Sequence, residues 1–197
     1  MNTEIEVKFL HIDHDEMRAK LTGIGAVCVK PMRTMRRVTF DSAEMKARNG
    51  WVRVRDEGDK VTFTYKQTDS FDIDGTKELE TTVGDFDTTI AILQEAGVAK
   101  GSFQESKRES WELGDVQIEL DEWPWLDPYI EIEAPTQELI HDVAAKLGLD
   151  MSQALSGDVM VAYREQYPHL GVHDTVGNQA EVKFGTPPPD MLRPRAQ

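Results

Sequence analysis

The chain has 197 residues, with 36 Asp and Glu against 22 Lys and Arg and a formal net charge of −14. This length suits one domain, and the charge excludes a nucleic-acid binder that relies on a broad basic surface, because phosphate backbones would be repelled. The lone cysteine, Cys28, excludes an internal disulfide and a multi-cysteine zinc site. No segment approaches the roughly 18–20 apolar residues of a membrane span, so we expect a soluble, cytoplasmic protein.

Eight segments alternate apolar and polar residues with the period of a half-buried strand. In chain order they are 3–9, about 34–41, 51–56, 60–67, 76–82, about 104–113, 115–122 and 129–134. Short turn signals at 56–59 and 114–115 join strands directly, which favours antiparallel neighbours. Eight strands are enough to close a sheet into a barrel.

Four helical segments interrupt the strands, at 13–25, 85–97, 136–148 and about 156–167. The sequence therefore predicts an α+β domain over residues 1–167, with helices packed outside the sheet. The tail at 168–197 is rich in Pro and Gly, and we expect it to be loosely ordered. Its segment AEVKF at 180–184 echoes EVKF at 6–9; we attribute this echo to chance, with an added or swapped edge strand as the alternative.

The polar row of most predicted strands is charged, and charges of one sign share a strand. The EIE runs at 4–6 and 131–133 are acidic, whereas RVR at 53–55 is basic. Because side chains alternate across a strand, each charged row occupies one face. In one interpretation this face is open to water, as in an ordinary antiparallel sheet. In the other, the sheet closes around it and gives an interior with an acidic and a basic sector.

A closed interior of this kind would need a ligand, because buried like charges are costly unless they are paired or neutralised. Clustered carboxylates suit a hard divalent cation such as Mg²⁺ or Mn²⁺. A polyphosphate suits the Arg and Lys side chains. Zinc is disfavoured, since none of the five histidines falls in a predicted strand.

The segment Glu4-Ile5-Glu6-Val7-Lys8 matches the ExExK signature of a known family. The later series WVRVRD, TFTYK, KELET, SKRESW, IELDEW and IEIEA follows in the order and spacing of that family's strands. Over about residues 2–167 the chain thus resembles the CYTH family, also called triphosphate tunnel metalloenzymes. The resemblance implies an eight-stranded antiparallel closed β-barrel, or tunnel, that holds Mg²⁺ or Mn²⁺ and a small triphosphate.

The resemblance also implies roles for individual residues. The metal-binding carboxylates would be Glu4, Glu6, Asp121, Glu131 and Glu133. The triphosphate clamp and catalytic cations would be Lys8, Arg53, Arg55, Lys66 and Arg108, and Glu4 and Glu6 would be catalytic as well. Glu78 and Glu80 match acidic positions for which we expect structural salt bridges.

Two positions depart from the family pattern. The sixth strand often carries a Lys-x-Arg pair, but Ser106 stands two residues before Arg108. A bulge that turns Lys107 inward would restore the missing cation, and so would an inward Arg37 on the second strand. We therefore include Lys107 and Arg37 among the candidate substrate-binding residues.

Three functions fit these residues. The preferred one is a metal-dependent triphosphatase acting on tripolyphosphate or on a nucleoside or thiamine triphosphate. The alternatives are a class IV adenylate cyclase, which converts ATP to cyclic AMP and pyrophosphate, and a triphosphate-binding module without turnover. The expected partner is a small triphosphate, with no nucleic acid and no membrane, and a homodimer is left open.

Overall fold

The computed structural model describes residues 2–70, 73 and 75–193, and for residues 2–4 it describes the backbone alone. Within these residues, nine strands lie on one hydrogen-bonded path and a tenth joins it at the side. The strands are β1 (Asn2–Glu4), β2 (Glu6–Phe9), β3 (Val27–Asp41), β4 (Gly50–Asp56), β5 (Val61–Thr68), β6 (Thr76–Val83), β7 (Ala99–Leu113), β8 (Val116–Glu122), β9 (Tyr129–Glu133) and β10 (Glu181–Val182). The helices are α1 (His14–Gly23), α2 (Ala43–Lys46), α3 (Phe86–Glu95), α4 (Gln137–Leu147) and α5 (Val159–Gln166).

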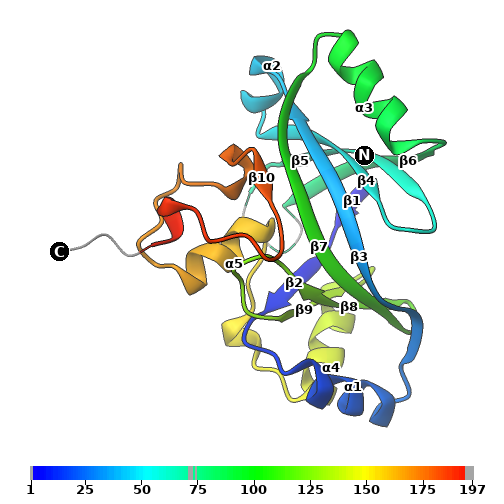
Figure 1. Cartoon of the computed structure of the whole chain (residues 1–197). Helices are drawn as coiled ribbons and strands as arrows, with labels where there is room; N and C mark the ends of the chain where they lie inside the picture. Colours follow the sequence, from blue (N-terminus) through cyan, green and yellow to red (C-terminus); the bar gives the residue numbers. More distant parts are fainter. Residues whose placement is uncertain (1, 71–72, 74, 194–197) are drawn as a thin grey trace.

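The sheet is antiparallel along its path and strongly curled (Figure 1). Its order is β1-β6-β5-β4-β3-β7-β8-β9-β2, so both edges come from one N-terminal segment. Residues 2–4 pair with β6, residues 6–9 pair with β9, and Ile5 lies between them. In the described residues β1 and β2 do not pair with each other, because they follow end to end in the chain. The sheet is therefore an open half-barrel. The prediction of a closed barrel is wrong, whereas the antiparallel strands and the outer helices are confirmed.

Two 15-residue strands, β3 and β7, run through the middle of the path and extend further than predicted. They pair from Val27 to Asp41, with register shifts between residues 28 and 30, 30 and 33, and 38 and 40. Such irregularities increase the local bend and twist of paired strands. They help to curl the sheet around the space that its charged faces line.

The helices cover the apolar outer face of the sheet, as predicted. Helices α1 and α4 pack on β2, β8 and β9 around Phe9, Leu21, Ile118 and Ile140. Helix α3 packs on β3 and β4 at the other end of the molecule (Figure 1). The short helix α2 was not predicted. No helix within the described residues has the length and apolar character needed to cross a membrane.

The tail packs on the domain over its described residues 168–193, so the expectation of a loosely ordered segment is wrong there. Leu170, Val176, Val182 and Leu192 are buried beside α5 in one apolar cluster. These four buried side chains anchor the tail, although its Pro and Gly content predicts a loosely ordered segment. The division into a domain at 1–167 and a tail at 168–197 stays a prediction.

Two residues of the AEVKF segment form an added strand, β10, as in the alternative to a chance echo. Strand β10 pairs with β7 in parallel, with Glu181 opposite Phe103. Strand β8 pairs with β7 only from Lys107 onward, so the first half of β7 leaves backbone groups for β10.

Candidate active site

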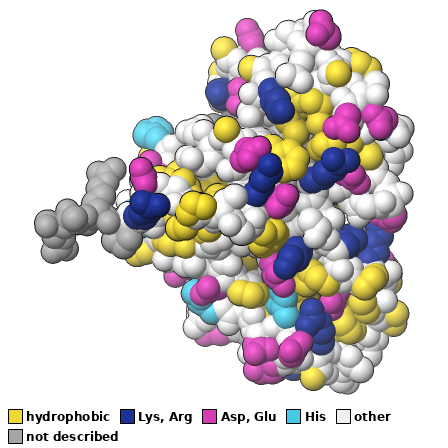
Figure 2. All heavy atoms as spheres, viewed as in Figure 1, with side chains coloured by type: hydrophobic (Ala, Val, Ile, Leu, Met, Phe, Trp, Pro, Cys, Tyr) yellow, Lys and Arg dark blue, Asp and Glu magenta, His cyan; other side chains and the backbone are white. Residues whose placement is uncertain are grey.

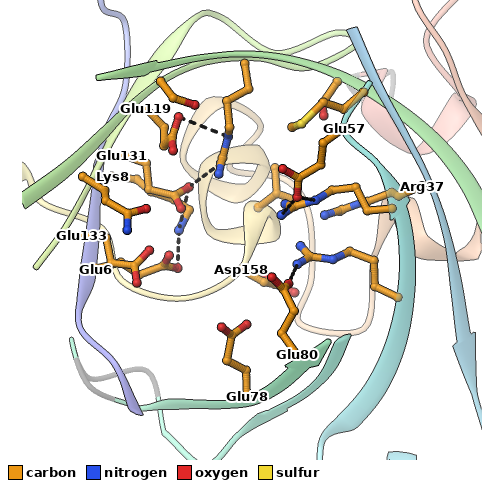
Figure 3. Close-up of a pocket in the computed structure, with 18 of the residues that line it drawn as sticks. Glu6, Lys8, Arg37, Glu57, Glu78, Glu80, Glu119, Glu131, Glu133 and Asp158 are labelled. Carbon is orange, nitrogen blue, oxygen red and sulfur yellow. Dashed lines mark hydrogen bonds and ion pairs between the residues drawn. The ribbon is translucent and has the colours of Figure 1, made fainter. Parts of the chain in front are cut away.

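The curl of the sheet surrounds a cavity of about 490 Å³. Strands β2 to β9 all contribute side chains to its wall, and Asp158 and Val159 contribute from the start of α5. Figure 3 shows Glu6, Glu119, Glu131 and Glu133 on one side and Arg37 on the opposite side, pointing toward a common centre. The outer surface seen in Figure 2 instead mixes basic and acidic side chains. The segregation of charge predicted from the strands is thus found inside the cavity.

The acidic sector is built by cross-strand pairs of β2, β8 and β9. Glu131 of β9 lies opposite both Lys8 and Glu119, and Glu133 lies opposite Glu6. The Lys8 ammonium donates to Glu6 Oε1 at 2.7 Å and to the carbonyl oxygen of Gly157 at 2.7 Å, and it lies 3.5 Å from Glu131 Oε2. Lys8 therefore links the two acidic strands while it faces the cavity.

Arg108 is held by a buried carboxylate behind it. Its Nε donates to Asp121 Oδ1 at 2.7 Å and its Nη2 donates to Asp121 Oδ2 at 2.5 Å, while Nη2 also lies 3.3 Å from Glu131 Oε2. Asp121 is fully buried and both of its oxygens accept from Arg108. In this geometry Asp121 positions Arg108, and its predicted role as a metal ligand stays a prediction.

The basic sector carries three neighbouring arginines on β3 and β4. Arg37 of β3 lies opposite Arg55 of β4 in the strand register. Arg53 stands two residues before Arg55 on β4. Burial, followed by the charges of its arginine neighbours, lowers the pKa of Arg53 to about 9 and that of Arg37 to about 10. Arg53 Nε is buried without a hydrogen-bond partner. This concentration of cations is unfavourable by itself and would be relieved by an anion.

Glu78 and Glu80 of β6 contact this sector as expected. Glu80 Oε2 lies 3.4 Å from Arg53 Nη2 and accepts from Thr64 Oγ1 at 2.7 Å, and Glu78 Oε2 lies 3.5 Å from Lys66 Nζ. These two carboxylates fix the directions of Arg53 and Lys66.

Two carboxyl groups of the acidic sector have strongly raised pKa values. Burial and the neighbouring Glu131 raise the pKa of Glu6 to about 8. Burial raises the pKa of Glu119 to about 7, although Arg108 opposes the shift. For Glu131, burial is outweighed by Lys8 and Arg108, which lower its pKa. The acidic sector therefore lacks enough positive charge to keep all its carboxylates ionised at neutral pH.

The donor set suits a hard divalent cation, although the residues do not form a finished site. Glu6, Glu119, Glu131 and Glu133 offer only oxygen ligands, and Glu119 Oε2 is buried without a hydrogen-bond partner. No three His, Cys, Asp or Glu side chains within the described residues are already arranged to hold a metal ion together. The Glu4 side chain, a predicted ligand, lies outside the described part. The residues present thus fit Mg²⁺ or Mn²⁺ in chemistry.

Lys107 and Arg37, the two residues considered as replacements for the missing cation, lie in different places. Lys107 donates to Glu122 Oε2 at 2.8 Å and lies over the Phe184 ring, outside the cavity. The register from Ser106 to Arg108 is continuous, so no bulge turns Lys107 inward. These contacts do not favour a substrate-binding role for Lys107, and that role stays a prediction. Arg37 does line the cavity, with Nε donating to Gln104 Oε1 at 2.7 Å.

Several charged residues of the cavity were missing from the predicted site. Arg33, whose Nη atoms lie 3.2 Å from Ser110 Oγ, belongs to the part of β3 that begins before the predicted strand. Glu119 shares the inward parity of Gln117 on β8, which could have identified it. Glu57 follows β4 and accepts from Arg55. Lys30 and Lys60 line the same cavity.

Replacing Lys107 provides a direct check on these positions. We expect Lys107→Met to keep tripolyphosphate affinity within about twofold of wild type, because an exposed ion pair contributes at most about 1 kcal/mol. We expect Lys66→Met, which removes a cation from the cavity wall, to weaken binding by at least about tenfold. Calorimetric titration of both variants measures this contrast, and equal losses would contradict the assignment.

The family model of the CYTH domain matches residues 2–157. The chain belongs to the CYTH family. No curated protein matches the sequence significantly.

Solved structures share the CYTH fold over most of the chain. The PH1012 protein from Pyrococcus horikoshii is 24% identical, with a TM-score of 0.69 over 81% of this chain and 98% of its own. A candidate adenylate cyclase from Vibrio parahaemolyticus is 14% identical, with a TM-score of 0.70 over 82% and 97%. The candidate adenylyl cyclase HpAC1 from Hippeastrum, described as having a dominant triphosphatase activity, is 13% identical, with a TM-score of 0.55 over 84% and 96%. At these identities the likeness shows the fold.

Proposed function

We propose that this CYTH protein is a metal-dependent triphosphatase that cleaves the terminal phosphoryl group of a small triphosphate in the charged cavity. The observation that carries the proposal is one cavity in which a cluster of carboxylates faces Arg37 across a common centre (Figure 3). Arg53 and Arg55 line the cavity beside Arg37. In this proposal the N-terminal segment, divided at Ile5 between both sheet edges, completes the wall of a tunnel.

The basic sector would hold the phosphates. Arg53, Arg55 and Lys66 face the cavity from β4 and β5, and Arg37 and Arg108 face it from β3 and β7. Guanidinium groups bind phosphate oxygens bidentately and so fix the orientation of the chain of phosphates. Catalysis of phosphoryl transfer depends mainly on such positioning and on neutralising charge.

The acidic sector would hold a divalent cation and handle the proton of the attacking water. Glu6, Glu131 and Glu133 are the described candidates to hold it, with Glu119 beside them. A divalent cation there would neutralise charge on the terminal phosphate and acidify water. Glu6 and Glu133 lie on neighbouring strands, opposite each other, where either can accept that proton.

We expect removal of divalent cations to abolish turnover. EDTA treatment followed by dialysis should reduce phosphate release by at least about 100-fold, and added Mg²⁺ or Mn²⁺ should restore it. Full activity after EDTA treatment would contradict a metal requirement, with the metal content of the sample measured in parallel.

Adenylate cyclase remains the second candidate, because solved structures with this fold include candidate adenylate cyclases. The two reactions differ in their products. Incubating wild-type protein with ATP, GTP, thiamine triphosphate or tripolyphosphate and Mg²⁺ or Mn²⁺ tests both. Orthophosphate supports the hydrolase, and cyclic AMP with pyrophosphate supports the cyclase. Binding without any product would support the non-catalytic module.

A further inference from the structure

A second cavity, of about 660 Å³, adjoins the charged cavity. Arg37, Trp51, Asp158 and Val159 line both cavities. A ligand whose phosphates lie among the arginines can therefore extend directly into the second cavity. Its volume lies within the range of pockets that bind small organic molecules, roughly 300–1,000 Å³.

The second cavity has one wall from the sheet and one from the C-terminal part of the chain. Phe40 and Asn49 lie at the ends of β3 and β4, whereas Arg164, Val172 and Asn178 come from α5 and the segment after it. The family match ends at residue 157. The C-terminal wall therefore belongs to a part of this chain that the family model does not match.

Contacts within the C-terminal segment hold this wall in place. Arg164 Nη2 donates to the carbonyl oxygens of Val172 at 3.2 Å and Asp174 at 3.3 Å. Thr175 Oγ1 accepts from the backbone N–H of Gly177 at 3.0 Å, and Val176 is buried. Together with the pairing of β10 on β7, these contacts make the wall part of the folded domain.

The lining differs in chemistry from the charged cavity. Val172 is 80% exposed at the wall of this cavity, one of few large apolar side chains that the described surface leaves open. Trp51 adds a partly exposed aromatic ring, Asn178 carries an amide, and Arg164 has a buried Nε without a hydrogen-bond partner. The lining also includes the charged side chains Asp41, Lys46, Asp69 and Asp158. A mixture of apolar and polar groups suits an organic group that has an aromatic ring and polar edges.

We propose that the second cavity binds the nucleoside part of a nucleoside triphosphate, with Arg37 at the junction and the phosphates in the charged cavity. The proposal rests on the proposed function and narrows its substrate class. It assigns the C-terminal segment a role in recognising the organic part of the substrate.

The test replaces two exposed lining residues that take no part in phosphate binding. The double variant Val172→Ser with Asn178→Ala removes apolar and amide contacts from the C-terminal wall. The matched control is Ile92→Ser, which changes a side chain 63% exposed on α3, away from both cavities. We measure KM and kcat for ATP, GTP and tripolyphosphate with Mg²⁺, and dissociation constants in EDTA by equilibrium dialysis.

We expect the double variant to raise KM and the dissociation constant for ATP or GTP roughly tenfold, the effect of losing small contacts in a pocket. The values for tripolyphosphate should stay within about twofold of wild type, and Ile92→Ser should change none of them. Equal effects on all substrates, or no effect on any, would overturn the proposal. If wild type binds tripolyphosphate but neither nucleotide, this inference fails while the proposed function stands. If wild type neither binds nor turns over any of the three with Mg²⁺ present, the proposed function fails too.

Discussion

Glu6→Gln is expected to reduce triphosphate turnover by about 100-fold or more while the protein remains folded. Glu6 faces the cavity, contacts Lys8, and is a candidate both to hold a divalent cation and to accept the proton of water. Gln keeps the size of the side chain but neither the charge nor the basicity, and loss of a general base costs about 100-fold or more. Phosphate release from tripolyphosphate with Mg²⁺ measures the effect. Turnover at the wild-type rate would contradict the assignment.

The same substitution should stabilise the protein in the absence of ligand. Because the pKa of Glu6 is raised from 4.5 to about 8, the folded state binds more protons than the unfolded chain between these pH values. Folding stability from this position therefore falls as pH rises through that interval. We expect Glu6→Gln to melt at a higher temperature than wild type at pH 8, with a difference that shrinks toward pH 4.5.

Thermal unfolding at several pH values measures this difference in EDTA. A gain of about 2 kcal/mol would raise Tm by roughly 4–8 °C in a protein of this size. Glu133→Gln, at the facing position on β9, serves as the matched comparison, because it removes a second carboxylate from the same sector. A lower Tm for Glu6→Gln at pH 8 would show that Glu6 stabilises the fold.

Arg53→Met is expected to weaken triphosphate binding by about 100-fold without destabilising the protein. Arg53 is buried beside Arg55 and Arg37, and its charge is unfavourable there in the absence of an anion. A buried charged contact with a phosphate contributes about 2–5 kcal/mol when it is truncated. Calorimetric titration with tripolyphosphate and thermal unfolding should therefore show lost affinity with an unchanged or higher Tm.

Arg108→Met is the matched comparison, because Arg108 is buried among carboxylates instead. Its loss leaves Asp121 without its bound cation and leaves Glu131 with Lys8 alone. We expect this variant to lose about 3–5 kcal/mol of stability as well as affinity, the cost of breaking a buried ion pair from one side. If Arg53→Met were destabilised as much as Arg108→Met, the basic sector would be a structural network and not an anion site.

The strand pattern predicted most of the fold and the two walls of the site. Apolar and charged residues alternate in segments such as 51–56 and 129–134, because one face of the sheet packs under helices. This pattern lies within each strand and can be read from the sequence alone. Arg53 and Glu131 therefore line the cavity as expected. The position of the two sheet edges depends instead on Ile5, where the N-terminal segment passes from pairing with β6 to pairing with β9, and no local pattern encodes that.

The differences between the predicted and the observed site have equally specific causes. Asp121 has the parity of a cavity residue, but Arg108 binds both of its oxygens from the next strand. Arg33 was missed because irregular pairing between residues 28 and 33 hides the alternation of β3. The second cavity could not be predicted, since it joins the ends of β3 and β4 to α5 and the segment after it, which lie far apart in the sequence.

Phosphorus NMR of tripolyphosphate incubated with wild-type protein and Mg²⁺ tests the central claim most directly, because it resolves substrate and products in one sample. We predict that the tripolyphosphate signals are replaced by pyrophosphate and orthophosphate in equal amounts, and that Glu6→Gln leaves them nearly unchanged over the same time. Persistence of tripolyphosphate with the wild-type protein, or equal cleavage by Glu6→Gln, would contradict a triphosphatase site in the charged cavity.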